Sequence, residues 1–248
     1  KQETPVTTTR FRGLAPRNVL IVVQVTMSLV LLLGAGLCLR SFANLLAVDP
    51  GFDRRNVLVI WFETDAADLS READKEHTRQ IIERVSTLPD VQAVSACDHL
   101  LPLSGSFGIK GLDELEGYVR RPGEEIHVGI RTVGPDYFHL LRIPILQGRE
   151  FDQRDLASGA DIAIVNESFV RRYWPNQDPL GKRIDGAEIV GVVADVREQK
   201  LWEEAEPRMY SMLHGDLSAG LTLLVRTRND PAPLTSLIQN QLTAIAPS

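Results

Sequence analysis

The 248 residues allow one or two domains, and a hydrophobic content of 44% is enough for a buried core. Residues 1–48 contain five basic residues and one acidic residue, which leaves 22 basic and 32 acidic residues in 49–248, a net charge of −10. Because nucleic-acid binding requires a basic surface that neutralises phosphates, we expect no nucleic acid among the partners.

The first predicted element is a membrane helix. Residues 19–39 are a run of 21 residues without a charge. As a helix with a rise of about 1.5 Å per residue, the run would span about 30 Å, the thickness of the hydrocarbon core of a bilayer. Apolar residues then recur at Leu45, Leu46 and Val48, which predicts that the helix continues past the bilayer as an amphipathic extension.

This run has two other interpretations. A cleaved signal peptide is the less favoured alternative, because its apolar core has only about 7–15 residues. A lipoprotein site would need a small residue before Cys38, but Leu37 stands there. Four basic residues precede the run and three follow it closely, so charge favours an inside N-terminus only slightly.

Beyond residue 49 the pattern predicts an α+β domain. Residues 57–62 and 91–96 are predicted strands on either side of a helix that begins after Ser70 and ends before Pro89. Residues 103–125 are rich in Gly, Ser and charge, and they predict loops or short hairpins. Further strands are predicted at 126–133, 162–165, 188–193 and 221–225, and further helices at 136–141, 166–174 and 230–245.

The sequence predicts no catalytic, cofactor-binding or metal residue, and no cofactor. Residues 176–183 (NQDPLGKR) lack the first glycine and the final hydroxyl of a phosphate-binding loop. Asn166 begins a glycosylation sequon, a pattern that is common by chance. No two histidines are three or four residues apart, so a helical zinc motif is absent among His77, His99, His127, His139 and His214.

Several stretches resemble the MacB-like, FtsX-like permeases of ABC transporters, particularly the large permeases with a duplicated core. In the family's order these stretches are VVQVTMSLVLLLGAGLCLRSFANLLAVDPGFDRRNVL, LPDVQAVSACDHLLPLSG, VGPDYFHLLRIPILQGREFDQRD, IAIVNESFVRRYWPNQDPLGKRI, EIVGVVADVR and PRMYSMLH. They cover nearly all of the chain after Arg17. Because complete members have several membrane helices, we expect this chain to be a fragment of a longer permease.

The resemblance implies a domain organisation. Residues 1–17 would be a cytoplasmic linker, and 18–48 the transmembrane helix with its extension. A MacB-like periplasmic domain would follow, with a porter-like α/β lobe formed by 49–102 and 206–248. An inserted strand-rich lobe would occupy 103–205.

The resemblance also implies a function as the permease subunit of an ABC-type export (efflux) or mechanotransmission system in the bacterial inner (plasma) membrane. Residues after about 48 would lie in the periplasm or outside the cell. A separate ABC ATPase subunit or domain would hydrolyse ATP, so the chain itself would not be an enzyme. Other expected partners are further permease copies or halves and the lipid membrane, and a periplasmic adaptor protein is a further candidate. The alternatives are a membrane-tethered extracytoplasmic sensor or binding module, and a regulator of a cell-wall hydrolase.

Overall fold

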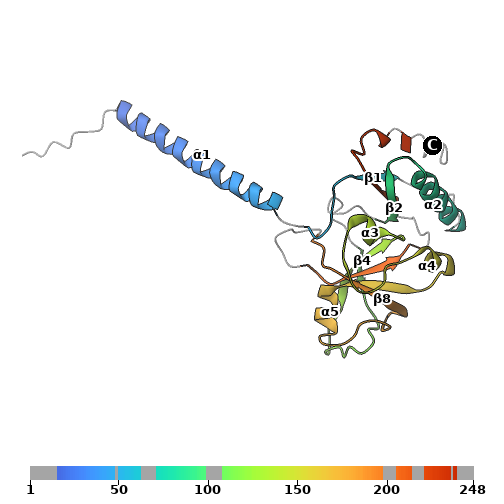
Figure 1. The fold of residues 1–248 in the computed structure, drawn as a ribbon. Helices are drawn as coiled ribbons and strands as arrows, with labels where there is room; N and C mark the ends of the chain where they lie inside the picture. The colour runs from blue at the N-terminus through green and yellow to red at the C-terminus, as the bar shows by residue number, and fades with distance from the viewer. Residues whose placement is uncertain are drawn as a thin grey trace, which may run out of the picture. The chain divides into compact units, whose positions relative to one another are not determined.

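The computed structural model describes residues 16–47, 50–62, 71–98, 108–197, 205–213, 221–235 and 237–238, and the chain divides into two units, 1–48 and 49–248. The first unit contains one helix, α1 (Pro16–Ala47), drawn in blue in Figure 1. Its segment Arg17–Ala43 is long and apolar enough to cross a membrane, by length and composition. All side chains of that segment are exposed within the unit. The helix includes the predicted run 19–39 and the backbone of the predicted extension, except for Val48, which lies outside the described residues.

The second unit is mixed α and β, as predicted. Its helices are α2 (Arg71–Ser86), α3 (Tyr137–Leu141), α4 (Gln153–Ser158) and α5 (Glu167–Tyr173). Its strands are β1 (Val57–Phe62), β2 (Val91–Cys97), β3 (Gly108–Gly111), β4 (His127–Val133), β5 (Ile145–Gly148), β6 (Ile162–Asn166), β7 (Arg183–Ile184), β8 (Ala187–Val193), β9 (Arg208–Met212) and β10 (Leu221–Thr227).

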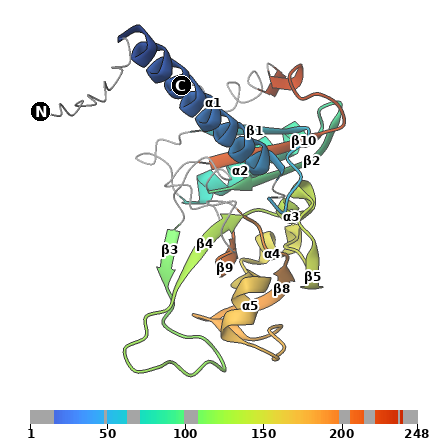
Figure 2. The same ribbon diagram turned by 90° about the vertical axis from the view of Figure 1, so that its left-hand side faces the viewer.

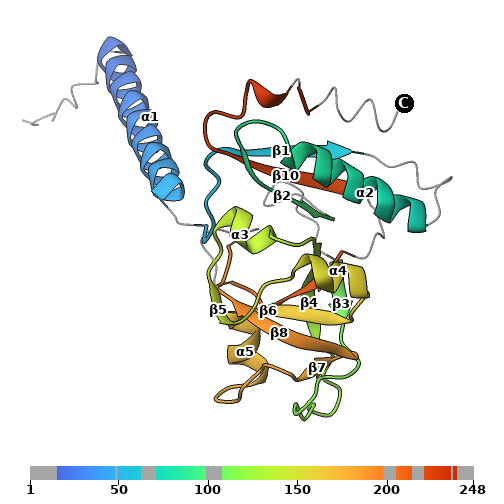
Figure 3. The ribbon, with the colours of Figure 1, turned by 45° about the vertical axis from the view of Figure 1, so that its right-hand side comes forward.

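These strands form one sheet, in which the pairing between two of the central strands is very short. The order is β1-β10-β2-β4-β9-β6-β8-β5, with β3 on β4 and β7 on β8. The pairs β4–β9 and β6–β8 are parallel, and the other pairs are antiparallel. Only Cys97 and Val133 pair between β2 and β4. The sheet therefore has two parts, the first made of β1, β10 and β2, and the second made of the remaining strands (Figure 3).

Helices cover both faces of the first part of the sheet. Figure 3 shows α2 lying along this part, and its residues Ile81 and Val85, four positions apart, are buried against Val94, Leu223 and Val225. This spacing places both side chains on one helix face. Each fully buried aliphatic side chain contributes about 1.5–3 kcal/mol.

Helix α3 packs on the other face and joins the two parts of the sheet. It contacts β2 and β10, and its buried residues share one core cluster with Leu224 of the first part and Val133 of the second. The two parts of the sheet are therefore connected by a packed core as well as by the residue pair between β2 and β4.

A second core lies at the far end of the second part. Three aromatic side chains are buried in it, Phe169 and Tyr173 of α5 and Trp174 directly after the helix. They pack with Leu112 and Leu115, which belong to the long connection between β3 and β4 (Figure 2). The indole N–H of Trp174 donates to the carbonyl of Glu116 over 2.9 Å. This connection is thereby held against α5.

The predicted strands are all found, and so are the predicted helices as far as the structure describes them. The structure adds helix α4 and strands β5, β7 and β9, which the sequence does not predict, and β3 falls in the range where loops or short hairpins are predicted. The last predicted helix is helical at residues 234–235 and 237–238, and the rest of it lies outside the described residues. The division into two lobes stays a prediction. Strand β9 falls within the range 206–248, but it pairs with β4 and β6 of the second part of the sheet.

Candidate functional site

The residues that connect α1 to β1 are hydrogen-bonded to several distant parts of the domain. We call residues 50–56 the connecting segment. At Gly51 (φ +84°) a Cβ atom would lie 2.6 Å from the carbonyl oxygen of Asp195, so only glycine fits here without displacement. The side chain of Asp53 accepts the N–H of Arg55 over 2.9 Å and fixes the next turn. Asn56 has a left-handed backbone conformation, with φ +54°.

The backbone of the connecting segment binds three different elements. The N–H of Asp53 donates to the carbonyl at the end of α3, at Leu141, over 2.8 Å. The carbonyl of Pro50 accepts from Arg197, which follows β8, and the carbonyl of Asn56 accepts from Thr227 of β10, each over 2.9 Å. The segment is therefore attached to both parts of the sheet.

Two arginines from distant segments meet at Asp53. The guanidinium of Arg142 lies 2.8 Å from Asp53 Oδ2, and Arg226 Nη1 lies 3.5 Å from the same oxygen. Arg226 also donates to the carbonyls of Asp53 (2.6 Å), Arg55 (3.0 Å) and Leu140. We call Asp53, Arg142 and Arg226 the arginine clamp. Its two guanidinium groups and one carboxylate carry a net charge of +1.

The burial and charge of the clamp change its pKa values. The pKa of Asp53 is lowered, first by the backbone hydrogen bond from Arg55 and then by the charges of Arg226 and Arg142, against a desolvation effect. Burial lowers the pKa of Arg226, whose side chain is only 6% exposed. The buried Arg226 is satisfied by carbonyl oxygens, while Arg142, 62% exposed, remains accessible to solvent.

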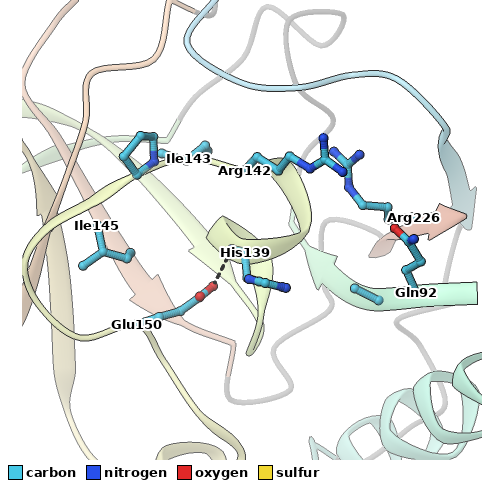
Figure 4. Close-up of a pocket in the computed structure, with 9 residues that line it drawn as sticks. Gln92, His139, Arg142, Ile143, Ile145, Glu150 and Arg226 are labelled. Carbon is cyan, nitrogen blue, oxygen red and sulfur yellow. Dashed lines mark hydrogen bonds between the residues drawn. The ribbon is translucent and has the colours of Figure 1, made fainter. Parts of the chain in front are cut away.

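A pocket of about 480 Å³ adjoins the clamp (Figure 4). Its lining residues come from β2, β10, α3, β5 and the residues next to α3 and β5, and they are Gln92, Ala93, His139, Arg142, Ile143, Pro144, Ile145, Glu150 and Arg226. The carboxylate of Glu150 accepts the N–H of Phe138 (2.7 Å) and the N–H of His139 (3.1 Å). Burial is the main cause that raises the pKa of Glu150.

A second polar cluster fixes the end of β8. Asn166 is 1% exposed, and its Oδ1 accepts from the N–H groups of Phe169 (3.0 Å) and Arg208 (2.8 Å). Its Nδ2 donates to Asp195 Oδ1 (2.7 Å) and to the carbonyl of Glu206 (2.8 Å). Asn166 caps α5 as predicted. Because it is buried and bonded, it is no acceptor for a glycan in the folded domain.

The motifs considered from the sequence do not come together in this site. Residues 176–183 form a turn after α5 in which Lys182 donates to Gln177 over 2.8 Å. His127 and His139 are exposed, and the side chains of the other three histidines lie outside the described residues. Within the part of the chain that the structure describes, no group of three His, Cys, Asp or Glu residues could hold a metal ion. The predicted absence of catalytic, cofactor and metal residues stays a prediction.

The arginine clamp was missed by sequence reasoning. The one local signal was Arg226 itself, a charged residue in the otherwise apolar strand LTLLVRT, because a buried arginine requires partners. Nothing in the local sequence indicates which residues those partners are.

Comparison with known proteins identifies the family. The profile described as MacB-like periplasmic core domain matches residues 18–219. A macrolide export ATP-binding/permease protein MacB of Mannheimia succiniciproducens is 30% identical over 70 residues, a match that covers 27% of this chain. The match spans only 11% of the length of that relative.

Solved structures show the fold. The periplasmic region of MacB from Actinobacillus actinomycetemcomitans has a TM-score of 0.52 and 17% identity, covering 82% of this chain and 89% of that one. The extracellular domain of the noncanonic ABC-type transporter YknZ from Gram-positive bacteria has a TM-score of 0.47 and 16% identity, covering 76% and 94%. The first of these confirms the predicted fold class, an apolar N-terminal helix followed by a domain with the fold of the MacB periplasmic region.

Proposed function

Because this chain belongs to the family of MacB-like periplasmic core domains, we propose that it is the membrane-anchored outer part of an ABC-type permease. In this proposal a cytoplasmic ABC ATPase hydrolyses ATP, and the outer domain moves in response to expel a substrate or to act on a partner. Helix α1 crosses the bacterial inner membrane, and the residues after about 48 are periplasmic or extracellular. Further permease copies or halves complete the assembly, and a periplasmic adaptor is a further candidate partner.

The observation that carries this proposal is the attachment of the connecting segment. A displacement passes from a membrane helix to a domain only through a short, stiff link. Only residues 48 and 49 separate Ala47 of α1 from Pro50, and three peptide steps span at most about 11 Å. From Pro50 onward the backbone is bonded to α3, to the residue after β8 and to β10. The chain between the end of α1 and the hydrogen-bonded part of the domain is therefore only two residues long.

The first test is to purify the full-length protein from membranes in mild detergent and assay for a co-purifying ATPase. The proposal predicts a stoichiometric ATPase whose turnover changes when the permease is bound. Changing Leu45 and Leu46 together to Asp should leave the assembly intact and weaken that effect on turnover, because it disturbs the helix just before the connecting segment. The matched control replaces both residues with Ile. An unchanged effect in the Asp variant would remove the transmission argument.

The pocket beside the arginine clamp favours one alternative, a membrane-tethered binding module. That function needs a ligand but no ATPase. A folded full-length protein without any associated ATPase would favour it over the permease. If an ATPase does associate, movement of a substrate distinguishes export from the regulation of a partner enzyme.

A further inference from the structure

The pocket next to the arginine clamp has a polar wall and an apolar wall. Arg142 and Arg226 line one side, and Ile143, Pro144 and Ile145 line another (Figure 4). Pockets of about 300–1,000 Å³ with mostly apolar walls and a few oriented polar groups are typical of small-molecule sites. At about 480 Å³ this pocket falls within that range.

The positive charge at the polar wall is incompletely balanced. Two guanidinium groups face the single carboxylate of Asp53, since Arg142 lies 2.8 Å and Arg226 3.5 Å from the same oxygen, Oδ2. Arg226 is fixed by its three bonds to carbonyl oxygens. The side chain of Arg142 has Asp53 as its partner and is 62% exposed, so a ligand can reach it.

Glu150 lies elsewhere on the pocket wall. Its carboxylate accepts the N–H groups of Phe138 and His139, and it forms no ion pair with Arg142 or Arg226. Within the part of the chain that the structure describes, Asp53 is the one carboxylate that pairs with these two arginines.

We propose that this pocket binds a partly apolar molecule that carries a carboxylate or phosphate group, and that this group pairs with Arg142 in place of Asp53. The guanidinium fork of arginine matches both oxyanions, and such charge-assisted hydrogen bonds are the strong ones. The apolar body of the molecule packs against Ile143, Pro144 and Ile145. The ligand thus removes one of the side-chain bonds that hold the connecting segment.

If the permease proposal holds, on which this consequence alone rests, ligand binding loosens the link between α1 and the outer domain. Arg226 keeps its bonds to the backbone of the connecting segment, so the segment is released only in part. Ligand binding and the coupling between α1 and the outer domain then depend on the same side chain, that of Arg142. A ligand that favours the released state shifts the population only by its difference in affinity for the two states.

The test is a ligand-observed NMR titration of the full chain in phosphatidylcholine nanodiscs at constant pH. The probes are N-acetyl-leucine, its neutral match N-acetyl-leucinamide, and inorganic phosphate. We expect saturable binding of N-acetyl-leucine that is at least about tenfold tighter than that of the amide, the size of a lost charge-assisted hydrogen bond. Equal binding of the acid and the amide would overturn the proposal. Phosphate that binds as tightly as N-acetyl-leucine would overturn the role of the apolar wall.

Variants locate the binding. Arg142→Met should weaken binding of N-acetyl-leucine about tenfold, and Asp53→Asn should strengthen it severalfold because Arg142 no longer has to leave a carboxylate. The matched control is Arg183→Met, since the side chain of Arg183 is also 62% exposed and also pairs with a carboxylate, that of Glu188 at 4.0 Å. An Arg142→Met variant that binds like the Arg183→Met variant would contradict the site. An Asp53→Asn variant without effect would contradict the competition.

Nanodiscs that contain phosphatidylglycerol distinguish the source of the anion. Weaker binding of N-acetyl-leucine in them assigns the site to a lipid headgroup, and unchanged binding assigns it to a soluble molecule. The titration needs no ATPase. Its failure would leave the permease proposal intact, and failure of the ATPase assay would leave the binding site intact.

Discussion

The carboxylate of Asp53 lies 2.8 Å from the guanidinium of Arg142, although the two residues are 89 positions apart in the chain. Arg226, another 84 positions further on, reaches the carbonyl of the same Asp53 over 2.6 Å. The connecting segment after α1 is thus held by Arg142, at the end of α3, and by Arg226 of β10. This relationship makes the connecting segment part of the rigid domain.

Replacing Arg226 with Met should destabilise the outer domain by about 3–5 kcal/mol. The change leaves three carbonyl groups without their buried donor and removes one charge from the clamp. Urea unfolding of the full chain, followed by the fluorescence of the buried Trp174, measures it. Arg183→Met, at an exposed arginine, should change the unfolding free energy by less than about 0.5 kcal/mol. Equal effects of the two substitutions would show that the clamp adds no stability.

Replacing Gly51 with Ala should cost more than the same change at Gly123. Both residues have a left-handed backbone, with φ +84° and +78°. At Gly123 the new Cβ would meet no atom within 4 Å, so only the backbone preference of about 1–2 kcal/mol is lost. At Gly51 the Cβ would also lie 2.6 Å from the carbonyl of Asp195. Thermal unfolding of the two variants compares them, and equal melting temperatures would exclude a close approach at Gly51.

Glu150→Gln should remove a pH dependence of stability. Because burial raises the pKa of Glu150 above its unfolded value, its contribution is greatest below about pH 4 and is lost as the pH rises through the folded-state pKa. Gln keeps an oxygen that accepts the N–H groups of Phe138 and His139 but cannot ionise. The variant should therefore gain stability relative to the original chain as the pH rises above about 4. A difference in unfolding free energy between the two proteins that stays constant with pH would contradict this account.

Asn166→Ala should destabilise the domain by about 2–4 kcal/mol. The substitution removes the cap of α5 together with bonds to the segments before β9 and after β8. Asn229 is the matched control because it is exposed and makes only a long contact of 3.4 Å with Asp90. Asn229→Ala should change the unfolding free energy by less than about 0.5 kcal/mol. A loss no larger at Asn166 than at Asn229 would mean that the buried cluster is not a structural one.

The features predicted from sequence are those with local causes. The run VLVIWF forms strand β1 as predicted, because β-branched and aromatic residues favour strands. Its expected burial is wrong, since β1 is an edge strand in which Val59 and Trp61 are exposed. Asn166 caps α5 because its side chain reaches an N–H only three residues away. Long periodic or strongly apolar segments can therefore be predicted from their own residues, without knowledge of their tertiary contacts.

The features that were missed are short or depend on distant residues. Helix α4 has only six residues, although Asp152 and Asp155 form a capping box that would have indicated its start. Strand β9 (RMYSM) pairs with β4 on one edge and β6 on the other, and its side chains enter two core clusters, Met209 in one and Tyr210 and Met212 in the other, so it shows no simple alternation. The partners in the arginine clamp are 89 and 173 positions apart, and no periodicity relates them.

The most direct test of the account measures whether ATP turnover moves the outer domain relative to α1. Spin labels are placed at Ala43 in α1 and at Val119, which is 89% exposed in the connection between β3 and β4, after Cys38, Cys97 and every other native cysteine of the full-length protein have been replaced. The distance between them is then measured by pulsed electron paramagnetic resonance, in the full-length permease with its ATPase. The account predicts a distance that changes between the ATP-bound and nucleotide-free states, and a broader, less responsive distribution when Asp53 and Arg142 are changed to Asn and Met. A distance that responds to ATP equally well without the Asp53–Arg142 pair would contradict the role of this pair in the link, and a distance that never responds to ATP would contradict the coupling itself.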